Sequence, residues 1–420
     1  MKKLLQELDE SISSADGSQV CYYLDENYFY ELFVQGSEEE DPVESMPSLD
    51  SVKQLVNKNV SHQKHRTYIT NYYQSLIYCF DKEDYMSAFS SMKDTLREFT
   101  LQVYEHENNW TCPIIQYLSN ALYRMGLKAQ VVFEQDEGNE DSSGMVKQSP
   151  LEQSVPTIQQ AYATSVKDRG DLSLSKKWGA LYLVNILMRI YFKLNNIGLM
   201  KKLIDTVETS KTLPELDLFP IGQQVTFKFF SGRVAIFQGK FIKAKEDLEF
   251  ALDNCHEDYV KNKKMIIQYL ACVNLMLGKY PTSWLCDKHG LIEFKGLSKA
   301  CRTGDLKSYR KSLRDNMEFF IKHGTYLMLE NAQIVVYRNL LRRVHQYHEQ
   351  SSRINISSFL GALKFVEEDP VTIDHAECMI GNLISQGYVR GYMSHEKQIL
   401  VLSKNNPFPK LFDLYSIVDE

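Results

Sequence analysis

Residues 388–404 read YVRGYMSHEKQILVLSK, and three amphipathic segments precede them, the last of which ends at Gln386. Apolar residues recur at helical spacing through most of the chain, and only this part shows the alternation that is typical of short strands. Amphipathic helices followed by a two-stranded hairpin predict a winged helix, a module that binds nucleic acid or partner proteins. Because it follows a long helical chain, the module indicates a scaffold subunit rather than an enzyme.

The first of the three segments carries a group of arginines. Its sequence, NAQIVVYRNLLRRVHQYH (331–348), places apolar side chains on one helical face and Arg338, Arg342 and Arg343 on another. The hairpin, or wing, adds three more cationic side chains: Arg390, Lys397 and Lys404. Lys and Arg supply many of the phosphate contacts in protein–DNA complexes. We therefore predict that these six residues contact nucleic-acid phosphates.

The third segment has the opposite character. TIDHAECMIGNLISQG (372–387) is expected to begin at Thr372 or Asp374 and to end at Gly387. It carries Asp374 and Glu377 and has no Lys or Arg. In a winged helix this third helix enters the major groove, where most contacts are made by basic or amide side chains. Base-specific DNA recognition is therefore not expected.

The net charge of −6 is unevenly distributed. Residues 1–160 hold 12 Lys and Arg against 26 Asp and Glu, a net of −14, and the remaining residues hold 36 against 28, a net of +8. Within residues 295–343, 11 basic side chains accompany four acids. This window is either the solvated outer face of long helices or a surface for a polyanion, such as nucleic acid or an acidic peptide.

The composition predicts a soluble intracellular protein without cofactors. Its 420 residues are 44% hydrophobic and 24% charged, which is ordinary for folded domains. The longest apolar stretch, WGALYLVNILM (178–188), has 11 residues, short of the ~20 that cross a bilayer, and the first residues do not form a signal peptide. The eight cysteines contain no C-x-x-C pair, so we expect free thiols in a reducing compartment and no metal site.

We find no sequence pattern of an enzyme. Nucleophile elbows, phosphate-binding loops, dinucleotide fingerprints and kinase motifs are absent from the sequence. The stretch DHAEC (374–378) has the residue types of a cysteine nucleophile, but Cys378 is expected on the buried apolar face of its helix. The prediction is a non-enzyme without catalytic residues.

A repeat signal precedes the winged helix. In FSGRVAIFQGKFIKAKEDLEFAL (230–252), Gly232, Gly239, Ala244 and Ala251 occupy the positions of a tetratricopeptide (TPR) helix pair. Weaker echoes follow at irregular spacing, which indicates a degenerate helical solenoid. The predicted fold is therefore an all-α solenoid of TPR-like helix pairs that ends in a C-terminal winged helix with a small β-hairpin.

Four regions follow from these patterns. They are an acidic helical region (1–160) with two mobile loops (36–48 and 134–150), TPR-like repeats (161–330), the winged helix (331–412) and a tail (413–420).

Several stretches resemble one branch of the PCI-domain family. They are SKKWGALYLVNILMRIYFKLNN (175–196), GRVAIFQGKFIKAKEDLEFALDNCH (232–256), KNKKMIIQYL (261–270), SSFLGALKFV (357–366), IDHAECMIGNLI (373–384) and GYVRGYMSHEKQILVLSKNNPFP (387–409). That branch contains the mRNA-export subunit of the transcription–export complex two and a relative described as a twelfth, signalosome-like subunit. The closing NPFP after a wing strand is the most specific local match.

The resemblance implies a non-catalytic scaffold subunit. Members of the branch pair through their winged helices with a larger PCI-domain protein, and a small, acidic, disordered subunit wraps their helical part. Together the pair presents a basic surface to RNA or DNA, in the nucleus and at the nuclear pore, with a cytoplasmic share and no membrane contact. One alternative is a protein-binding scaffold of a signalosome-like complex, or one associated with splicing or elongation, without a direct nucleic-acid role. Another is a regulatory subunit of a proteasome-lid-like or translation-initiation assembly.

Overall fold

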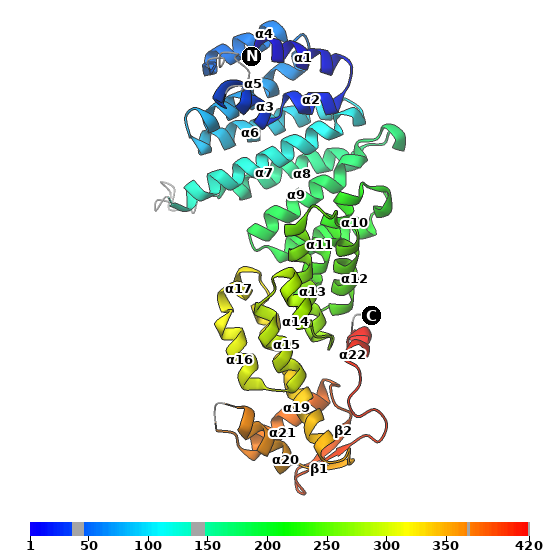
Figure 1. Ribbon diagram of the computed structural model, residues 1–420. Coiled ribbons are helices and arrows are strands. Elements are labelled where there is room, and N and C mark those ends of the chain that lie inside the picture. The colour runs from blue at the N-terminus through cyan, green and yellow to red at the C-terminus, as the bar shows by residue number, and fades with distance from the viewer. Residues whose placement is uncertain (36–45, 136–147, 368–369, 419–420) are drawn as a thin grey trace, which may run out of the picture. The chain divides into compact units, whose positions relative to one another are not determined.

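The computed structural model describes residues 1–35, 46–135, 148–367 and 370–418. The described chain is mostly helical with one small antiparallel sheet, as predicted, and it divides into two compact units, Met1–Phe227 and Lys228–Glu420 (Figure 1). Most of the two predicted mobile loops lies outside the described residues. The second predicted loop, 134–150, overlaps helices at both ends, because α7 continues to Gln135 and α8 begins at Pro150. None of the described helices is both long and apolar enough to cross a membrane.

Among its described residues, the first unit consists of helices joined by loops and turns. Its helices are α1 (Lys2–Ser13), α2 (Gly17–Tyr23), α3 (Glu26–Tyr30), α4 (Leu49–Asn59), α5 (Gln63–Phe80), α6 (Tyr85–Phe99), α7 (Cys112–Gln135), α8 (Pro150–Lys167), α9 (Ala180–Lys193), α10 (Ile197–Thr209) and the first part of α11 (Ile221–Phe237). Short π-helical or 3₁₀ segments are η1 (Glu31–Gln35), η2 (Thr100–Tyr104), η3 (Asn109–Thr111), η4 (Leu172–Leu174), η5 (Lys176–Gly179) and η6 (Leu216–Leu218).

Acidic or hydroxyl side chains start several of these helices. The caps are Asp16 for α2, Asp25 for α3, Ser48 for α4, Asp84 for α6 and Ser149 for α8. Each accepts hydrogen bonds from backbone N–H groups that have no partner within the helix. Buried tyrosines such as Tyr68, Tyr72 and Tyr73 fill much of the interior. Tyr72 and Tyr117 both donate their hydroxyls to the carbonyl of Leu24, so the buried phenols are satisfied.

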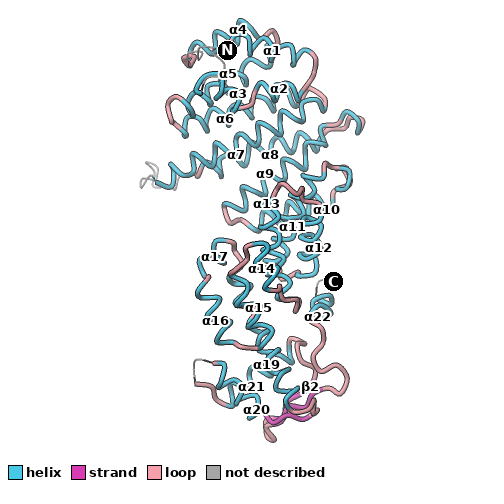
Figure 2. The backbone as a smooth tube through the Cα atoms, viewed as in Figure 1, coloured by secondary structure: helices cyan, strands magenta, loops and turns pink. Residues whose placement is uncertain are grey.

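The second unit contains the rest of α11, a run of helices and the sheet. The helices are α12 (Phe241–Asp253), α13 (Val260–Met276), α14 (Ser283–His289), α15 (Glu293–Thr303), α16 (Leu306–Asp315), α17 (Met317–Lys322), α18 (Tyr326–Asn331), α19 (Gln333–Tyr347), α20 (Ile356–Val366), α21 (Ile373–Ser385) and α22 (Leu411–Val418). The strands are β1 (Arg353–Asn355), β2 (Gly391–Ser394) and β3 (Ile399–Leu402), which Figure 2 shows together beside α20.

Small residues bring α11 and α12 together as the repeat pattern predicts. A Cβ on Gly232 would lie 2.8 Å from the Cγ of Leu248, so a larger residue would push the two helices apart. Ala244 and Ala251 are fully buried on α12. Gly239 closes the turn with a φ of +74°, a conformation that glycine adopts without strain.

The winged helix is present, with one strand more than predicted. Helices α19, α20 and α21 precede the β2–β3 hairpin, and β1 pairs with β3 on its other side, so the strand order is β1-β3-β2. Ile354 lies opposite Leu400 in this added pair, and both are buried. Three residues carry too little alternation to be recognised as a strand from the sequence. Thr372 caps α21 and Gly387 follows its end with a φ of +78°, as predicted.

The stretch predicted as a tail contains part of a helix. Residues 411–418 form α22, so the predicted border between 412 and 413 falls inside this helix. The ring of Tyr415 packs against Phe241 of α12, with the ring centroids 5.0 Å apart, and its hydroxyl bonds that of Tyr388 at 2.6 Å. Helix α22 thus connects the end of the winged helix to the solenoid helices of the same unit.

Two turn glycines allow a matched test of this packing. Gly304 has a φ of +70°, close to that of Gly239, but an added Cβ at Gly304 would lie 2.6 Å from the backbone N of Leu340, whereas nothing lies within 4 Å at Gly239. We expect G239A to lower the free energy of unfolding by about 1–2 kcal/mol through backbone strain alone. G304A should lose about 1–3 kcal/mol more, because α15 and α19 must move apart. Urea denaturation followed by circular dichroism measures both, and equal losses would contradict the close approach.

Candidate nucleic-acid interface

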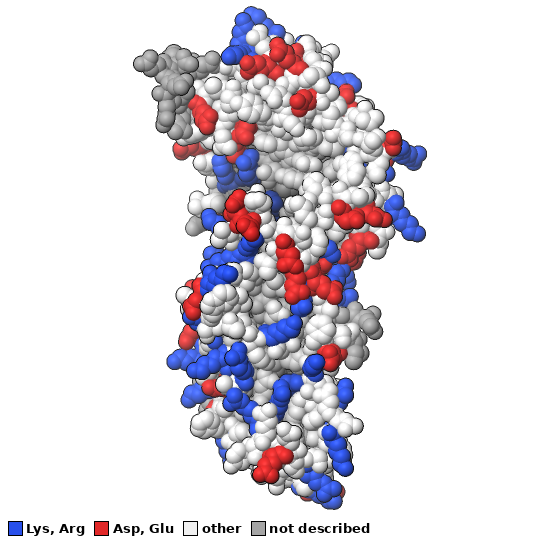
Figure 3. Space-filling model, turned by 45° about the vertical axis from the view of Figure 1, so that its right-hand side comes forward, with Lys and Arg blue, Asp and Glu red and all other residues white. Residues whose placement is uncertain are grey.

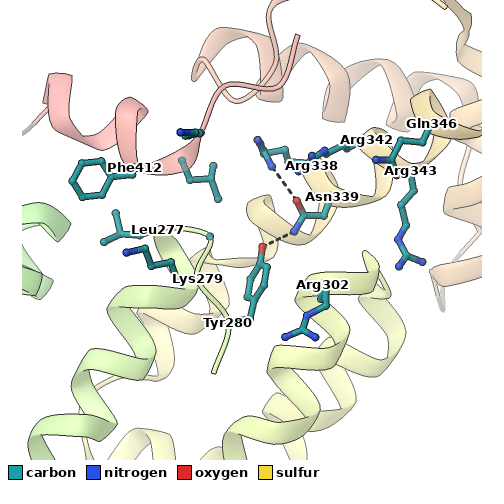
Figure 4. A pocket seen from close by; sticks show the side chains of 13 residues that line it. Leu277, Lys279, Tyr280, Arg302, Arg338, Asn339, Arg342, Arg343, Gln346 and Phe412 are labelled. Atoms are coloured by element: carbon teal, nitrogen blue, oxygen red, sulfur yellow. Dashed lines mark hydrogen bonds between the residues drawn. The ribbon is translucent and has the colours of Figure 1, made fainter. Parts of the chain in front are cut away.

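A basic cavity lies within the second unit, between the solenoid, the winged helix and the segment before α22 (Figure 4). Its volume is about 450 Å³. The lining residues are Leu277, Gly278, Lys279, Tyr280, Arg302, Arg338, Asn339, Arg342, Arg343, Gln346, Lys410, Leu411 and Phe412. Six of these are Lys or Arg and none is Asp or Glu. A cavity lined in this way is suited to an anion.

The chain brings these cations together through two tight turns. After α13, Gly278 adopts a φ of +76°, and an added Cβ there would lie 3.1 Å from Leu411 Cδ1, so the turn that carries Lys279 packs directly on α22. After α15, Gly304 makes the close approach to Leu340 of α19 described above. Arg302 therefore lies beside the arginines of α19. Cations that are far apart in the sequence share one wall because these turns carry no side chains.

Arg338 does not lie on the exposed face where the helical pattern predicted it. Its side chain is 4% exposed, and it donates from Nη1 to Asn339 Oδ1 at 3.0 Å and from Nη2 to the carbonyl of Pro409 at 2.6 Å. The prediction that Arg338 is exposed is wrong because the segment that leads to α22 covers this side of α19. Arg342 and Arg343 are exposed, as predicted.

Asn339 supports this arrangement from the neighbouring position. Its Nδ2 donates to the hydroxyl of Tyr280 at 2.7 Å and to the carbonyl of Cys301 at 2.8 Å, which joins α19 to α15 and to the turn after α13. Figure 4 shows Arg338, Asn339 and Tyr280 as one connected line of hydrogen bonds at the cavity wall.

The charge of Arg338 has only neutral hydrogen-bond partners. None of the described carboxylates forms an ion pair with it, and its Nε is buried without an acceptor. Burial, followed by the nearby charge of Arg342, lowers the pKa of Arg338 to about 10. Even so, the guanidinium stays protonated at neutral pH, so the cavity wall carries a buried positive charge.

The cations of the wing are separate from the cavity. Arg390, Lys397 and Lys404 are exposed, and within the described part of the chain none of the three forms an ion pair with a carboxylate. The backbone N–H of Arg390 donates to the carbonyl of Pro407 at 2.8 Å, so the NPFP segment is fixed to the wing. The six residues predicted to contact phosphates thus form two groups: three on α19 at the cavity and three on the wing.

The third helix is less available to nucleic acid than its sequence suggested. Glu377 is 8% exposed, and its Oε2 lies 2.7 Å from Nδ1 of His395 in the wing. This carboxylate therefore holds the wing to α21 instead of facing a ligand. The prediction of a buried Cys378 is wrong, since that thiol is exposed, because the buried positions of α21 are Ala376, Glu377, Ile380 and Leu383.

Three cations of the cavity were not singled out from the sequence. Arg302 belongs to the basic window at 295–343, whereas Lys279 and Lys410 stand outside it. The signal that could have drawn attention to them is their position next to a turn glycine or next to the NPFP motif. Among the described residues, no group of His, Cys, Asp and Glu is placed to hold a metal ion.

Residues 313–404 match the PCI domain family. The chain is 37% identical over 328 residues to the PCI domain-containing protein 2 homolog of Dictyostelium discoideum, which covers 78% of this chain and 75% of the relative. It is 35% identical over 336 residues to PCI domain-containing protein 2 of Xenopus laevis, with 78% and 80% covered. It is also 29% identical over 326 residues to the Protein CSN12 homolog of Neurospora crassa, with 71% and 72% covered.

Replacing Arg338 by Gln tests whether this side chain holds the segment before α22. The variant loses the charged donor to Pro409, a bond of a kind that contributes about 1.5–3 kcal/mol. We expect α22 amides, such as that of Leu414, which bonds the Lys410 carbonyl, to exchange with deuterium about 10- to 100-fold faster. The exposed R343Q variant serves as the control and should leave these rates unchanged. Unchanged exchange in R338Q would show that the bond to Pro409 does not hold the segment.

Proposed function

The chain belongs to the PCI domain-containing protein 2 family, and we propose that it is a non-catalytic scaffold subunit of a nuclear complex that couples transcription to mRNA export. In this role it binds RNA or DNA jointly with a larger PCI-domain partner. The observation that carries the proposal is the set of exposed cations on α19 and the wing that have no ion-pair partner among the described residues. They offer phosphate contacts on the same module that would join the partner.

The character of the module favours contact with the nucleic-acid backbone. Arg342, Arg343 and Lys397 are exposed and able to reach phosphates, which are the contacts that position a protein without reading sequence. The exposed end of α21 presents Asp374, whose charge opposes entry into the major groove. Binding should therefore depend on charge and salt more than on base sequence.

Exposed aromatic side chains on the winged helix support a protein partner there. Tyr347 is 86% exposed, Phe365 88% and Tyr392 64%. Aromatic residues are enriched in protein–protein interfaces, and leaving such rings in water has no benefit for the isolated chain. We propose that a second winged helix, from the larger PCI-domain protein, covers part of this surface.

A second surface is suited to the small acidic subunit. Between residues 284 and 327, exposed apolar side chains accompany the basic window: Trp284 is 67% exposed, Ile292 69% and Leu327 72%. Figure 3 shows Lys and Arg gathered over the lower part of the view, within the second unit. An extended acidic peptide with a few apolar anchors would match both properties of this surface.

The alternative is a protein-binding scaffold of a signalosome-like complex without a nucleic-acid role. The name of the Neurospora relative, Protein CSN12 homolog, favours this alternative. Both roles use the same fold and the same module. The two proposals differ in whether the free cations bind phosphates.

A salt-titrated RNA-binding measurement on the purified complex with the larger partner tests the nucleic-acid role. Each phosphate contact contributes about 0.7 to the slope of log affinity against log salt for a single strand. We expect the triple variant R342Q, R343Q, K397Q to weaken binding and to lower the slope by about 2. Three exposed lysines of the first unit, changed in K201Q, K202Q, K211Q, provide a control with the same number of removed charges.

The control variant should retain the affinity and the slope. If the triple variant binds RNA as tightly as the unchanged complex, the phosphate assignment is wrong and the signalosome-like alternative is favoured.

Affinity purification of the tagged chain, followed by mass spectrometry, tests the partner proposal. We expect a larger PCI-domain protein among the recovered proteins. In the double variant F365S, Y392S, its recovery should fall at least about tenfold, the equivalent of about 1.4 kcal/mol. The matched control is Y22S in the first unit, where Tyr22 is 54% exposed. Equal recovery in all three samples, or recovery without any PCI-domain protein, would contradict a joint at the winged helix.

A further inference from the structure

We propose that the basic cavity of the second unit binds a compact polyphosphate, a small molecule that carries several phosphate groups close together. This inference goes beyond the scaffold role and does not depend on RNA binding. It assigns a ligand to the cavity between α15, α19 and α22, where the turn after α13 completes the wall.

The first argument is the uncompensated charge of the lining. Lys279, Arg302, Arg338, Arg342, Arg343 and Lys410 come from four segments of the chain and surround one cavity that has no carboxylate in its wall. None of the six forms an ion pair with a described carboxylate. Gathering like charges in one place is unfavourable unless an anion neutralises them. Phosphate groups do this best for arginine, whose planar guanidinium can donate two parallel hydrogen bonds.

The second argument is the state of Arg338 at the cavity wall. Arg338 is only 4% exposed. Its Nη1 and Nη2 donate hydrogen bonds to Asn339 and to the carbonyl of Pro409, whereas its Nε is buried and has no acceptor. A buried charged group with an unused donor is costly, and proteins rarely leave one without a function. An anion in the cavity that Arg338 lines would offset this charge electrostatically, without a new hydrogen bond to the buried Nε.

The third argument is the size of the site and the arrangement of its walls. A volume of about 450 Å³ falls in the range of small-molecule pockets. Arg338 is buried, whereas Arg302, Arg342 and Lys410 are exposed, so the positive groups extend from the wall to the surface. A compact ligand with several phosphates can contact both levels at once. An extended nucleic-acid strand would contact the exposed cations and leave the buried charge of Arg338 without a nearby anion.

Occupancy would also hold the module in place. Arg302 belongs to the solenoid, Arg342 to the winged helix and Lys410 to the segment before α22. A single ligand that contacts all three links these parts of the second unit, and above its dissociation constant it should raise their stability with the logarithm of its concentration. The polyphosphate would thus act as a structural ligand of the scaffold.

Isothermal titration of the full chain with inositol hexakisphosphate, and separately with inorganic tripolyphosphate, tests the proposal at physiological salt. We expect one molecule to bind per chain, the melting temperature to rise, and the amides of α19 and α22 to be protected from deuterium exchange. R302Q and K410Q should each weaken binding about tenfold while the melting temperature without ligand stays the same. The wing variants K397Q and K404Q remove the same charge outside the cavity and should change the affinity less than about twofold.

Three results would overturn the proposal. The first is that neither compound binds. The second is that several molecules bind per chain and that cavity and wing variants lose affinity to the same extent. The third is that a single-stranded RNA displaces the polyphosphate and that R302Q and K410Q weaken its binding as much as they weaken polyphosphate binding. The last result would assign the cavity to nucleic-acid phosphates. Failure of the RNA proposal is seen separately, because the polyphosphate titration contains no RNA.

Discussion

The hydrogen bond from Arg338 Nη2 to the carbonyl of Pro409 fixes the segment through which the winged helix continues into α22. It ties the NPFP segment to α19, while the carbonyl of Pro407 accepts from the backbone of Arg390 in the wing. The chain then enters α22, where Tyr415 packs on Phe241 of the solenoid. Because the segment is held on both sides before α22 begins, the winged helix has a fixed attachment to the helices that precede it. The short NPFP motif is therefore a structural connection, which gives a physical reason why this stretch is the most specific local match to the PCI branch.

A second arginine in the same unit shows what is unusual about Arg338. Arg310 of α16 forms an ion pair with Glu367 and donates to the hydroxyl of Tyr337 at 3.0 Å. Burial acts to lower its pKa, but Tyr337 and Glu367 outweigh this and leave the pKa raised. For Arg338 the hydrogen-bond partners are neutral, and burial together with the nearby charge of Arg342 lowers the pKa. Arg310 joins the solenoid to the winged helix, and Arg338 joins α19 to the segment before α22, but only the charge of Arg310 is neutralised by the protein itself. Arg338 therefore has a structural role through its hydrogen bonds while its charge has no counterion within the described chain, and the proposed polyphosphate would supply one.

The sequence predicted the fold well because its strongest signals are local. Helical periodicity, the caps at Thr372 and Gly387 and the glycine turns of the repeats each depend on a few neighbouring residues. The missed features depend on distant ones. Strand β1 exists because β3 offers Leu400 as a partner for Ile354, and Arg338 is buried because a segment about 70 residues later covers it. The cavity was not predicted from the sequence for the same reason, since its cations come from four separate segments. A helical wheel identifies faces of an isolated helix, but it does not show which face another segment will cover.

The third helix shows how the same module is directed away from reading DNA. A recognition helix needs polar side chains that are free to meet base edges. Here Glu377 is buried and bonded to His395 of the wing, and the exposed Asp374 lies three residues before it, in the first turn of α21. The interaction that orders the wing therefore consumes one of the polar side chains of α21 and leaves a negative charge at its exposed end. Cationic side chains remain on α19 and on the wing, which precede and follow this helix in the chain. Such a distribution suits a module that contacts phosphates at its edges while its position is set by other parts of the protein and by a partner.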